Sequence, residues 1–446
     1  LGGMLAEPTP TKHKVGEKVL LARSSGCSIE CKLVSLLGEG GNASVFRVNT
    51  NGKICALKVY RAHGWLRHLC NEASILLSLN YPRRHPNVLR VDSVWYEKPA
   101  QEVFFLTEHI DDGDLGRWMN DERLYEGSKE QQLARLLRTA HHIGHALDHV
   151  HGLEILHLDV NPANVLLTNN GRAVLADFSE SSQGKRGDDG VIRARMKGCT
   201  PAYASPNMRS ILFEARAKPA AQRAEVLGAR FVTQSDDIWC FASTVFSMFA
   251  ECGWTRGQSF AEAWHCRQSV AFRVPMPSDV RLLLESCLTS GQHTMRSIAD
   301  AIKQLSMIPI DVPELGHGLD DAHCGILRNN LGLALHHYGY TDEAREQYQH
   351  AIRADNSSQT DNSSQTIKCD VNLGQHAALV MEGSRGKNLV WAAVQERLRQ
   401  VVGNSDHPVG CTVEVEGSML LIHIIRAAFW DEMTESRLIT DVGFLQ

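Results

Sequence analysis

The sequence predicts an α+β chain in which a small β-rich region comes before a larger helical region. Between residues 31 and 109, apolar and β-branched residues fall in short runs separated by glycine or asparagine, as in strands. After Asp114, apolar residues recur three and four positions apart, which is typical of helices. The length of 446 residues corresponds to two or three domains. We therefore expect two lobes with a cleft between them, followed by a further helical region.

The composition excludes several classes of protein. Hydrophobic residues make up 43% of the chain, which is enough for packed cores. The net charge of −5 gives no electrostatic reason to bind nucleic acid, and no apolar run reaches the roughly 18 residues that span a bilayer. The 12 cysteines are scattered, and the nearest pair, Cys27 and Cys31, is expected to be ordinary thiols rather than zinc ligands. Scattered cysteines favour a reducing compartment, so the expected location is intracellular, cytoplasmic or nuclear.

The β-rich region follows a polar N-terminal segment. Residues 1–30 contain Pro8 and Pro10 and are expected to form a flexible tail. The first residue is leucine rather than methionine, which leaves open a missing N-terminal segment. A helix is predicted over Leu66–Leu79. Strands are predicted over Cys31–Leu37, Ser44–Val48, Ile54–Tyr60, Val88–Tyr96 and Val103–His109.

The larger region is predicted to contain long helices over Glu130–His151 and Asp236–Cys252. Between these helices, Val165–Leu167 and Ala173–Leu175 flank a turn sequence, Asn-Asn-Gly, at residues 169–171. This pattern predicts a β-hairpin.

A glycine-rich segment at Leu37–Val45 is the first sign of chemistry. Glycines allow the backbone to approach phosphates closely and to present N–H donors to their oxygens. Lys58 follows on the next predicted strand, and a lysine that points into a cleft needs an anionic partner. Glu72, on the predicted helix, is the expected partner. Taken alone, a glycine-rich segment between two strands is more often a simple turn. A lone lysine on a strand is more often exposed to solvent.

The segment His157–Asn164, followed by Asp177, carries the strongest signal. Asp159 supplies a carboxylate that can orient a hydroxyl nucleophile. Asn164 and Asp177 supply an amide and a carboxylate, which suit Mg²⁺ because this hard ion prefers oxygen ligands. The predicted hairpin joins these two residues, so both are expected at the edge of one rigid element.

The glycine-rich segment, Lys58, Glu72, the His157–Asn164 segment and Asp177 follow one another in the order typical of the eukaryotic-type protein kinase family. The resemblance to this family covers residues 31–308. The resemblance implies a bilobal fold, with a β-rich N-lobe and a helical C-lobe, that uses ATP and Mg²⁺ and acts on protein substrates. It implies catalytic roles for Asp159, Lys58, Glu72 and Asn161 and metal binding by Asn164 and Asp177. The residues that it places around ATP are Gly38, Glu39, Gly40, Gly41, Asn42, Ala43, Val45, Ala56, Lys58, Glu108, Ile110, Asp114 and Leu166.

The same resemblance assigns supporting roles. Thr107 is the gatekeeper beside a hinge at Glu108–Ile110, and His151 supports the catalytic loop. Asp237 begins a segment that resembles the buried helix anchoring this loop. Thr200 indicates serine or threonine substrates, since the family places a threonine there in that class.

Four positions depart from the family pattern. Leu158 replaces an arginine and Asn161 replaces a phosphate-contacting lysine. Ser179 replaces a glycine, and Asn207 replaces a glutamate whose partner would be Arg296. Because phosphoryl transfer depends mainly on positioning and electrostatics, we expect these changes to slow transfer rather than abolish it. The alternative is a pseudokinase scaffold that binds nucleotide or protein partners without phosphoryl transfer.

Leu158 leads to a further expectation about regulation. The arginine that it replaces usually binds a phosphate on the activation segment, which the resemblance places at residues 177–207, and leucine cannot donate such hydrogen bonds. Activity is therefore expected not to require phosphorylation of Ser181, Ser182 or Thr200.

Two other features allow more than one interpretation. His141, His145 and His149 recur every four residues, a spacing that can hold a metal, although a polar helix stripe is the simpler interpretation. The insertion Phe213–Arg230 is a candidate helix whose binding partner the sequence does not identify.

The C-terminal region differs from the rest of the chain in composition and in its pattern of apolar residues. A linker containing proline and glycine is expected at residues 309–322, and residues 323–446 are predicted to form all-α helical hairpins. Within them, the hexamer DNSSQT occurs twice over residues 355–366, which predicts a flexible insertion.

The helical hairpins resemble tetratricopeptide repeats. The spacing from Gly325 to Ile352 resembles one repeat of about 34 residues, and a weaker copy begins near Ile367. Ser418–Trp430 is a candidate helical cap. The resemblance implies a region that docks a partner protein. A plain helical extension, or a brace for the kinase domain, is the alternative.

Overall fold

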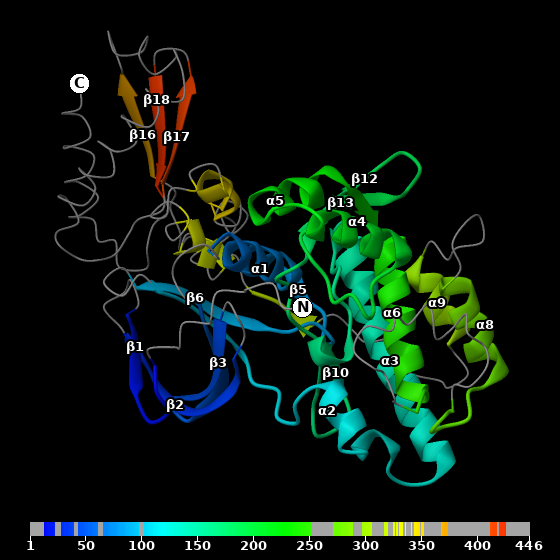
Figure 1. Cartoon of the computed structure of the whole chain (residues 1–446). Helices are drawn as coiled ribbons and strands as arrows, with labels where there is room; N and C mark the ends of the chain where they lie inside the picture. The colour runs from blue at the N-terminus through cyan, green and yellow to red at the C-terminus, as the bar shows by residue number, and fades with distance from the viewer. Residues whose placement is uncertain are drawn as a thin grey trace. The chain divides into compact units, whose positions relative to one another are not determined.

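The computed structural model describes most of the chain up to residue 305 and parts of the chain after it (Figure 1). The described ranges are 13–22, 28–39, 43–60, 66–97, 102–251, 271–288, 297–305, 316–319, 367–372, 411–416 and 419–424, with part of 324–351. The chain divides into two compact units. Unit 1 comprises Leu1–Leu77, Val91–Thr107 and Leu319–Gln446, and unit 2 comprises Ser78–Arg90 and Glu108–Gly318.

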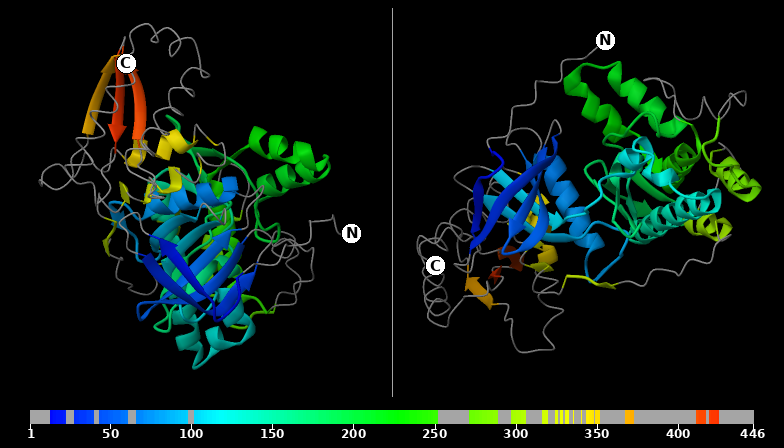
Figure 2. Two further views of the ribbon diagram at one scale, coloured as in Figure 1. Left: turned by 90° about the vertical axis from the view of Figure 1, so that its left-hand side faces the viewer. Right: turned by 90° about the horizontal axis from the view of Figure 1, so that it is seen from below.

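Unit 1 contains a six-stranded sheet that curls around its own core (Figure 2). Its strands, in spatial order, are β1 (Lys18–Ala22), β2 (Ser28–Glu39), β3 (Ala43–Thr50), β4 (Lys53–Tyr60), β7 (Glu102–Glu108) and β6 (Val91–Glu97). Phe46, Leu57 and Phe104 are buried in the core that the sheet surrounds. The five predicted strands are confirmed, with β6 beginning three residues later than predicted.

The flexible tail predicted over residues 1–30 is wrong for residues 18–22 and 28–30, which are strand. β1 lies inside that range and pairs antiparallel with β2 from Lys18↔Lys32 to Ala22↔Ser28. The apolar stretch Val19–Leu21 explains the difference, since Val19 is buried in the core of the sheet.

Helix α1 (Leu66–Leu79) has the predicted bounds. Leu76 and Leu77 are fully buried. The described residues of 324–335 and 343–351 are also helical, and they belong to the same unit as α1.

The all-α prediction for the end of the chain is wrong for three described segments. β16 (Ile367–Asn372), β18 (Met419–Ile424) and β17 (Cys411–Glu416) form an antiparallel sheet in that order. The weaker repeat copy near Ile367 and the helical cap at Ser418–Trp430 are therefore not supported. The hexamer pair at 355–366 lies outside the described residues, and the first repeat stays a prediction.

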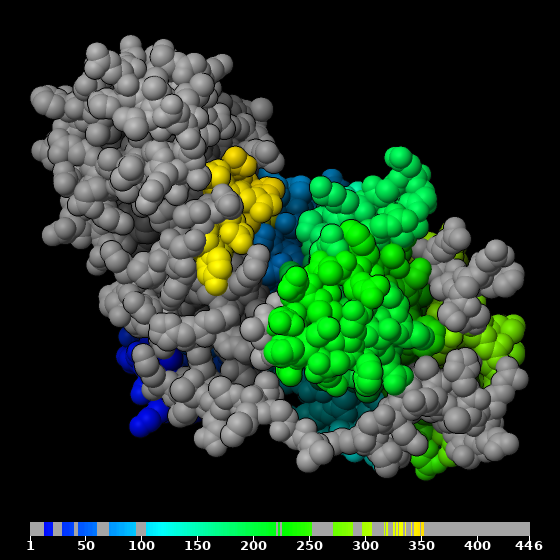
Figure 3. All heavy atoms as spheres, turned by 45° about the horizontal axis from the view of Figure 1, so that its top comes forward, coloured from blue at the N-terminus to red at the C-terminus, as the bar shows by residue number. Residues whose placement is uncertain are grey.

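Unit 2 is mainly helical and holds the hairpin predicted from the turn sequence. Its helices are α2 (Leu115–Asn120), α3 (Lys129–Gly152), α4 (Pro206–Arg216), α5 (Ala220–Ala229), α6 (Gln234–Phe249), α8 (Ser278–Cys287) and α9 (Ile298–Gln304). The hairpin consists of β9 (Val165–Leu167) and β10 (Ala173–Leu175) in the expected register. The insertion Phe213–Arg230 contains the end of α4 and the whole of α5, and the bright green atoms of these helices form part of the face seen in Figure 3. Within the described ranges, no helix is long and apolar enough to cross a membrane.

Candidate active site

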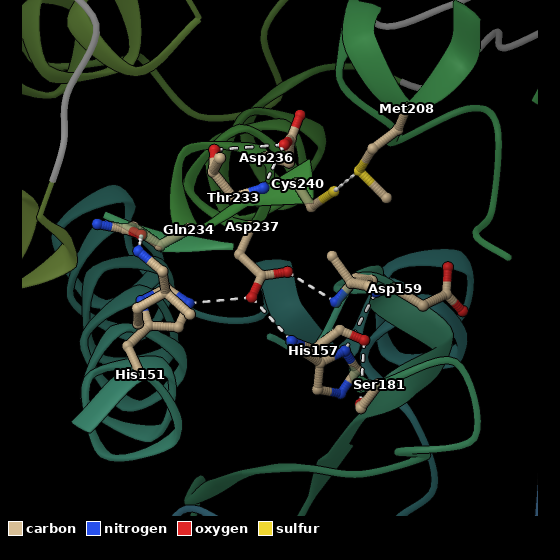
Figure 4. Close-up of polar contacts among 12 residues, drawn as sticks. His151, His157, Asp159, Ser181, Met208, Thr233, Gln234, Asp236, Asp237 and Cys240 are labelled. Carbon is tan, nitrogen blue, oxygen red and sulfur yellow. Dashed lines mark hydrogen bonds and ion pairs between the residues drawn. The ribbon is translucent and has the colours of Figure 1, made fainter. Parts of the chain in front are cut away.

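The loop after β8 (Ile155–Leu156) is held by the buried carboxylate of Asp237 on α6 (Figure 4). Asp237 is fully buried and accepts hydrogen bonds from the backbone N–H groups of His157 (2.8 Å) and Leu158 (2.7 Å). His151 Nε2, at the end of α3, lies 2.9 Å from the same carboxylate. These contacts confirm the anchoring geometry expected for Asp237 and His151, and they fix the loop to two long helices.

Leu158 occupies the left-handed region of backbone space, with φ of 65°. This conformation costs roughly 1–2 kcal/mol for a residue with a side chain. The charge-assisted bond from Leu158 N to Asp237 offsets that cost. The leucine side chain is fully buried, so it contributes apolar packing where the family pattern has a cation.

Asp159 follows directly and is the best-oriented carboxylate of the loop. Its two oxygens accept hydrogen bonds from Thr200 N (2.6 Å) and Asn164 Nδ2 (2.8 Å). Burial raises the pKa of Asp159, and the hydrogen bonds from Thr200 and Asn164 oppose part of that shift. The result is a partly desolvated carboxylate in one orientation, which suits a group that must accept a proton.

Asn161 replaces the lysine of the family pattern with a neutral side chain beside Asp159. Its side-chain oxygen accepts from Ala163 N (2.9 Å) and caps a short 3-10 helix, Pro162–Asn164. Its Nδ2 donates to the carbonyl of Asp159 (2.9 Å) and to Thr200 Oγ1 (3.3 Å). Asn161 therefore joins the catalytic loop to Thr200 by neutral hydrogen bonds, where the family pattern has a lysine.

The two predicted metal ligands lie at the open ends of the β9–β10 hairpin. Asn164 precedes β9, and Asp177 follows β10 after Ala176, whose N–H donates to Asn164 O (2.9 Å). Asp177 has φ of 56°, and Ser179 N donates to its carboxylate at 3.4 Å. The side-chain nitrogen of Asn164 is directed to Asp159, which leaves the amide oxygen as the atom that can bind a cation. Two oxygen donors of this kind fit Mg²⁺.

In unit 1, Lys58 and Glu72 form the expected ion pair. Lys58 Nζ lies 2.9 Å and 2.7 Å from the two carboxylate oxygens of Glu72, which is only 2% exposed. Lys58 stands on β4 opposite Val45 of β3, and Val45 in turn pairs with Gly38 of β2.

The remaining predicted nucleotide-binding residues divide between the two units. Glu39, Ala43 and Ala56 lie on the sheet strands of unit 1. Gly40, Gly41 and Asn42 lie outside the described residues. In unit 2, Glu108 exchanges hydrogen bonds with Arg90, and Ile110 follows in the same segment. Asp114 caps α2 by accepting from Arg117 N (2.9 Å), and its backbone pairs with that of Leu166.

The activation segment is ordered by its own small sheet, which sequence reasoning missed. β12 (Lys185–Arg186), β13 (Ile192–Arg195) and β14 (Phe231–Thr233) pair antiparallel, so the segment is joined to the strand just before α6. A second pair, β11 (Ser182–Gln183) with β8, ties it to the catalytic loop. The short alternation Ile-Arg-Ala-Arg at 192–195 was the available signal, since its apolar residues are the buried ones.

Glu180 is the other residue that the sequence did not reveal. Burial, followed by the charges of Asp159 and Asp177, raises its pKa to about 7, and Lys197 acts in the opposite direction. A Cβ at Gly198 would collide with the Glu180 carboxylate, so this carboxylate lies tightly against the backbone of the activation segment.

Two of the three evenly spaced histidines on α3, His141 and His149, contact backbone carbonyl groups. His141 Nε2 lies 3.0 Å from Leu305 O, and His149 Nε2 lies 3.1 Å from Leu79 O. His145 stacks on His141. Among the residues that the structure describes, no group of three or more His, Cys, Asp or Glu side chains could hold a metal ion. His141 is buried rather than part of a half-exposed stripe, and these histidines have structural contacts.

Asn207 hydrogen-bonds to Asp236, whereas the glutamate that the family has at this position would pair with Arg296. Its Nδ2 donates weakly to both oxygens of Asp236, at 3.4 and 3.3 Å. Arg296, the partner expected for a glutamate there, lies outside the described residues.

Comparison with known proteins agrees with this geometry. A family model for the protein kinase domain matches residues 31–305. The serine/threonine-protein kinase mos of Xenopus laevis is 29% identical over 244 residues, which cover 52% of this chain and 61% of mos. Mitogen-activated protein kinase kinase 7 of Arabidopsis thaliana is 30% identical over 225 residues, or 48% of this chain and 62% of that protein. The chain thus spans less than two thirds of the length of either relative.

Proposed function

Because the chain belongs to the protein kinase family, we propose that it is an active enzyme that transfers the γ-phosphoryl group of ATP to serine or threonine hydroxyls of proteins. The observation that carries the proposal is the Asp159 carboxylate, which Asn164 and Thr200 hold in one orientation. Mos and other relatives of this chain are serine/threonine-protein kinases by name, which supports this substrate class.

In this mechanism, Asp159 orients the substrate hydroxyl and accepts its proton. Its raised pKa makes it a better base than an exposed aspartate. Asn164 and Asp177 hold Mg²⁺, which neutralises phosphate charge when it is bound. Lys58, held by Glu72, binds phosphate oxygens. Asn161 supplies no positive charge to the transferred group, so we expect slower transfer than a lysine at that position would allow.

The alternative is a scaffold that binds nucleotide or partners without transfer. Radiolabel transfer from ATP to a generic protein substrate, or to the chain itself, separates the two functions. The physiological substrate can then be sought on a peptide array.

We predict that Lys58→Met and Asp177→Asn each lower kcat by at least about 10²–10³-fold while the protein stays folded, because each removes one charge that acts on phosphate or metal. Matched controls are Lys53→Met, on the same strand in an exposed ion pair, and Asp188→Asn, an exposed residue of the activation segment. Both controls are expected to stay within about twofold of the parent. Undiminished turnover in either Lys58→Met or Asp177→Asn contradicts the kinase mechanism.

The C-terminal region is proposed to dock a partner protein or to brace the kinase domain. Contacts of the described tail residues favour the brace. Arg328 and Gln347 hydrogen-bond to Ser74 on α1, and Asn330 Nδ2 donates to Val94 O on β6.

A further inference from the structure

We propose that Arg328 is a positioning residue of the kinase: it holds α1 in the orientation in which Glu72 reaches Lys58. The proposal rests on the proposed function. It assigns a role in the reaction to a tail residue that lies outside the segment matched by the kinase family model, residues 31–305.

Three side chains from three helical segments form a closed hydrogen-bonded triangle. Arg328 Nη1 donates to Ser74 Oγ (3.0 Å) on α1 and to Gln347 Oε1 (2.7 Å). Gln347 Nε2 completes the triangle by donating to Ser74 Oγ (3.0 Å). Each pair of segments is therefore joined directly, and α1 cannot shift without breaking two of the three bonds.

Two of the three side chains in the triangle are buried, and Ser74 is half-buried. Arg328 and Gln347 are each only 4% exposed. A guanidinium removed from water is strongly penalised when it lacks hydrogen-bond acceptors. Burial indeed lowers the pKa of Arg328. The cation is therefore held to Ser74 and Gln347 much more firmly than an arginine on the surface would be.

Ser74 and Glu72 lie on different sides of α1. Residues two apart on an α-helix point about 200° away from each other. Glu72 reaches Lys58 on β4, whereas Ser74 binds the tail. The helix is thus held from two sides, by the sheet at Glu72 and by the tail at Ser74. Loss of the tail contact frees α1 to move, and Glu72 moves with it.

Apolar packing seats the tail on the same unit. Leu327, Leu331 and Leu335 are buried at four-residue spacing on the segment that carries Arg328. Asn330, on this segment, binds β6 through Val94 O. The views agree that the described tail residues, drawn in yellow, lie against α1 (Figures 1 and 3). Arg328 therefore belongs to a helical segment that packs against the rest of unit 1.

The first test compares Arg328→Met with Arg345→Met in the full-length protein. Arg345 lies on the segment that carries Gln347, but it is exposed. We expect Arg328→Met to lower kcat/KM for ATP at least tenfold, with KM for a peptide substrate within twofold of the parent. We expect Arg345→Met to stay within twofold in both constants, and Arg328→Lys, which keeps the charge, to recover part of the loss. Equal activity of the two methionine variants overturns the proposal.

A double-mutant cycle separates positioning from a general loss of structure. If Arg328 acts through Glu72, then Arg328→Met costs no more than twofold in a Glu72→Gln background. The same tenfold loss in both backgrounds overturns the proposal. Should Arg328→Met fail to fold, Ser74→Ala replaces it in the cycle, because that change removes only the hydroxyl that accepts both bonds.

Hydrogen exchange gives a readout that does not need phosphoryl transfer. We expect backbone amides of residues 66–79 to exchange at least tenfold faster in Arg328→Met or Ser74→Ala than in Arg345→Met. Unchanged exchange overturns the role of Arg328. A parent protein that lacks transferase activity but shows this change in exchange would overturn the proposed function alone.

Discussion

Partial burial, together with the nearby charges of Asp159 and Asp177, raises the pKa of the half-buried Glu180 carboxyl to about 7. A carboxyl pKa that is raised in the folded state means that folding disfavours the ionised form. Its contribution to stability is therefore fully present below the unfolded pKa of about 4.5 and is lost as the pH rises through about 7.

Glu180→Gln should remove this pH dependence. In magnesium-free buffer, we expect the free energy of unfolding of the variant, relative to the parent, to increase by about 1–3 kcal/mol between pH 4.5 and pH 8. Urea unfolding of both proteins across this range gives the measurement. A constant difference between the two proteins would show that Glu180 ionises normally. Glu225→Gln, an exposed change on α5, is the matched control.

Single residues also mark what the sequence could predict. Lys58, Asp159 and Asn164 were recognisable because their chemistry comes with fixed spacing along the chain. Glu180 carried no such signal. Its pKa depends on partial burial, and Gly198 of the activation segment lies against its carboxylate. This contact forms only when the chain folds.

At the scale of the elements, serine hydroxyls tie the activation segment to neighbouring backbone. Ser181 Oγ donates to His157 O (3.0 Å), and Ser182 Oγ donates to Arg195 O (2.7 Å), with both serines buried. A basic residue of the segment, Arg186, binds His151 O (2.9 Å). Together with the strand pairing, these contacts support the expectation that activity does not require phosphorylation of Ser181 or Ser182.

We therefore predict that phosphatase treatment leaves peptide phosphorylation within about threefold of the untreated enzyme. A Ser181→Ala/Ser182→Ala variant should remain active while losing about 1 kcal/mol of stability for each buried hydrogen bond. Kinetic assays and thermal unfolding of the treated enzyme and the variant supply the measurements. A tenfold loss on dephosphorylation, about 1.4 kcal/mol of barrier, would show that another cation has replaced the missing arginine at 158.

Elements differed in how well the sequence predicted them. α1 and the β9–β10 hairpin were predicted with their observed bounds, because helical period and turn chemistry are local signals. The segment Met419–Ile424 was predicted as helix and is a strand. A short, continuously apolar run fits either structure, and pairing with Cys411–Glu416 and Ile367–Asn372 decides between them. Such long-range pairing is not visible in local sequence.

At the scale of the whole molecule, the tail consists of two parts with different consequences for the enzyme. The helical residues up to 351 contact α1 and β6, whereas the three strands after residue 366 pair with one another. We predict that a chain ending at residue 352 keeps peptide phosphorylation within about threefold of the parent, while a chain ending at residue 310 loses at least tenfold. Peptide assays on the two truncated proteins supply the measurement. Equal activity would assign the whole tail to partner docking.

The triangle at Ser74 also has a consequence for how the protein is made. Ser74 is synthesised 254 residues before Arg328 and 273 residues before Gln347. At roughly 5–20 residues per second, α1 is synthesised roughly 10–50 s before the tail residues that bind Ser74. During that interval the nascent chain has Lys58 but lacks the tail contact to α1, and the surface of α1 that the tail will cover is open to chaperones. Under the role proposed for Arg328, the kinase domain becomes competent only late in translation, when the tail has been made.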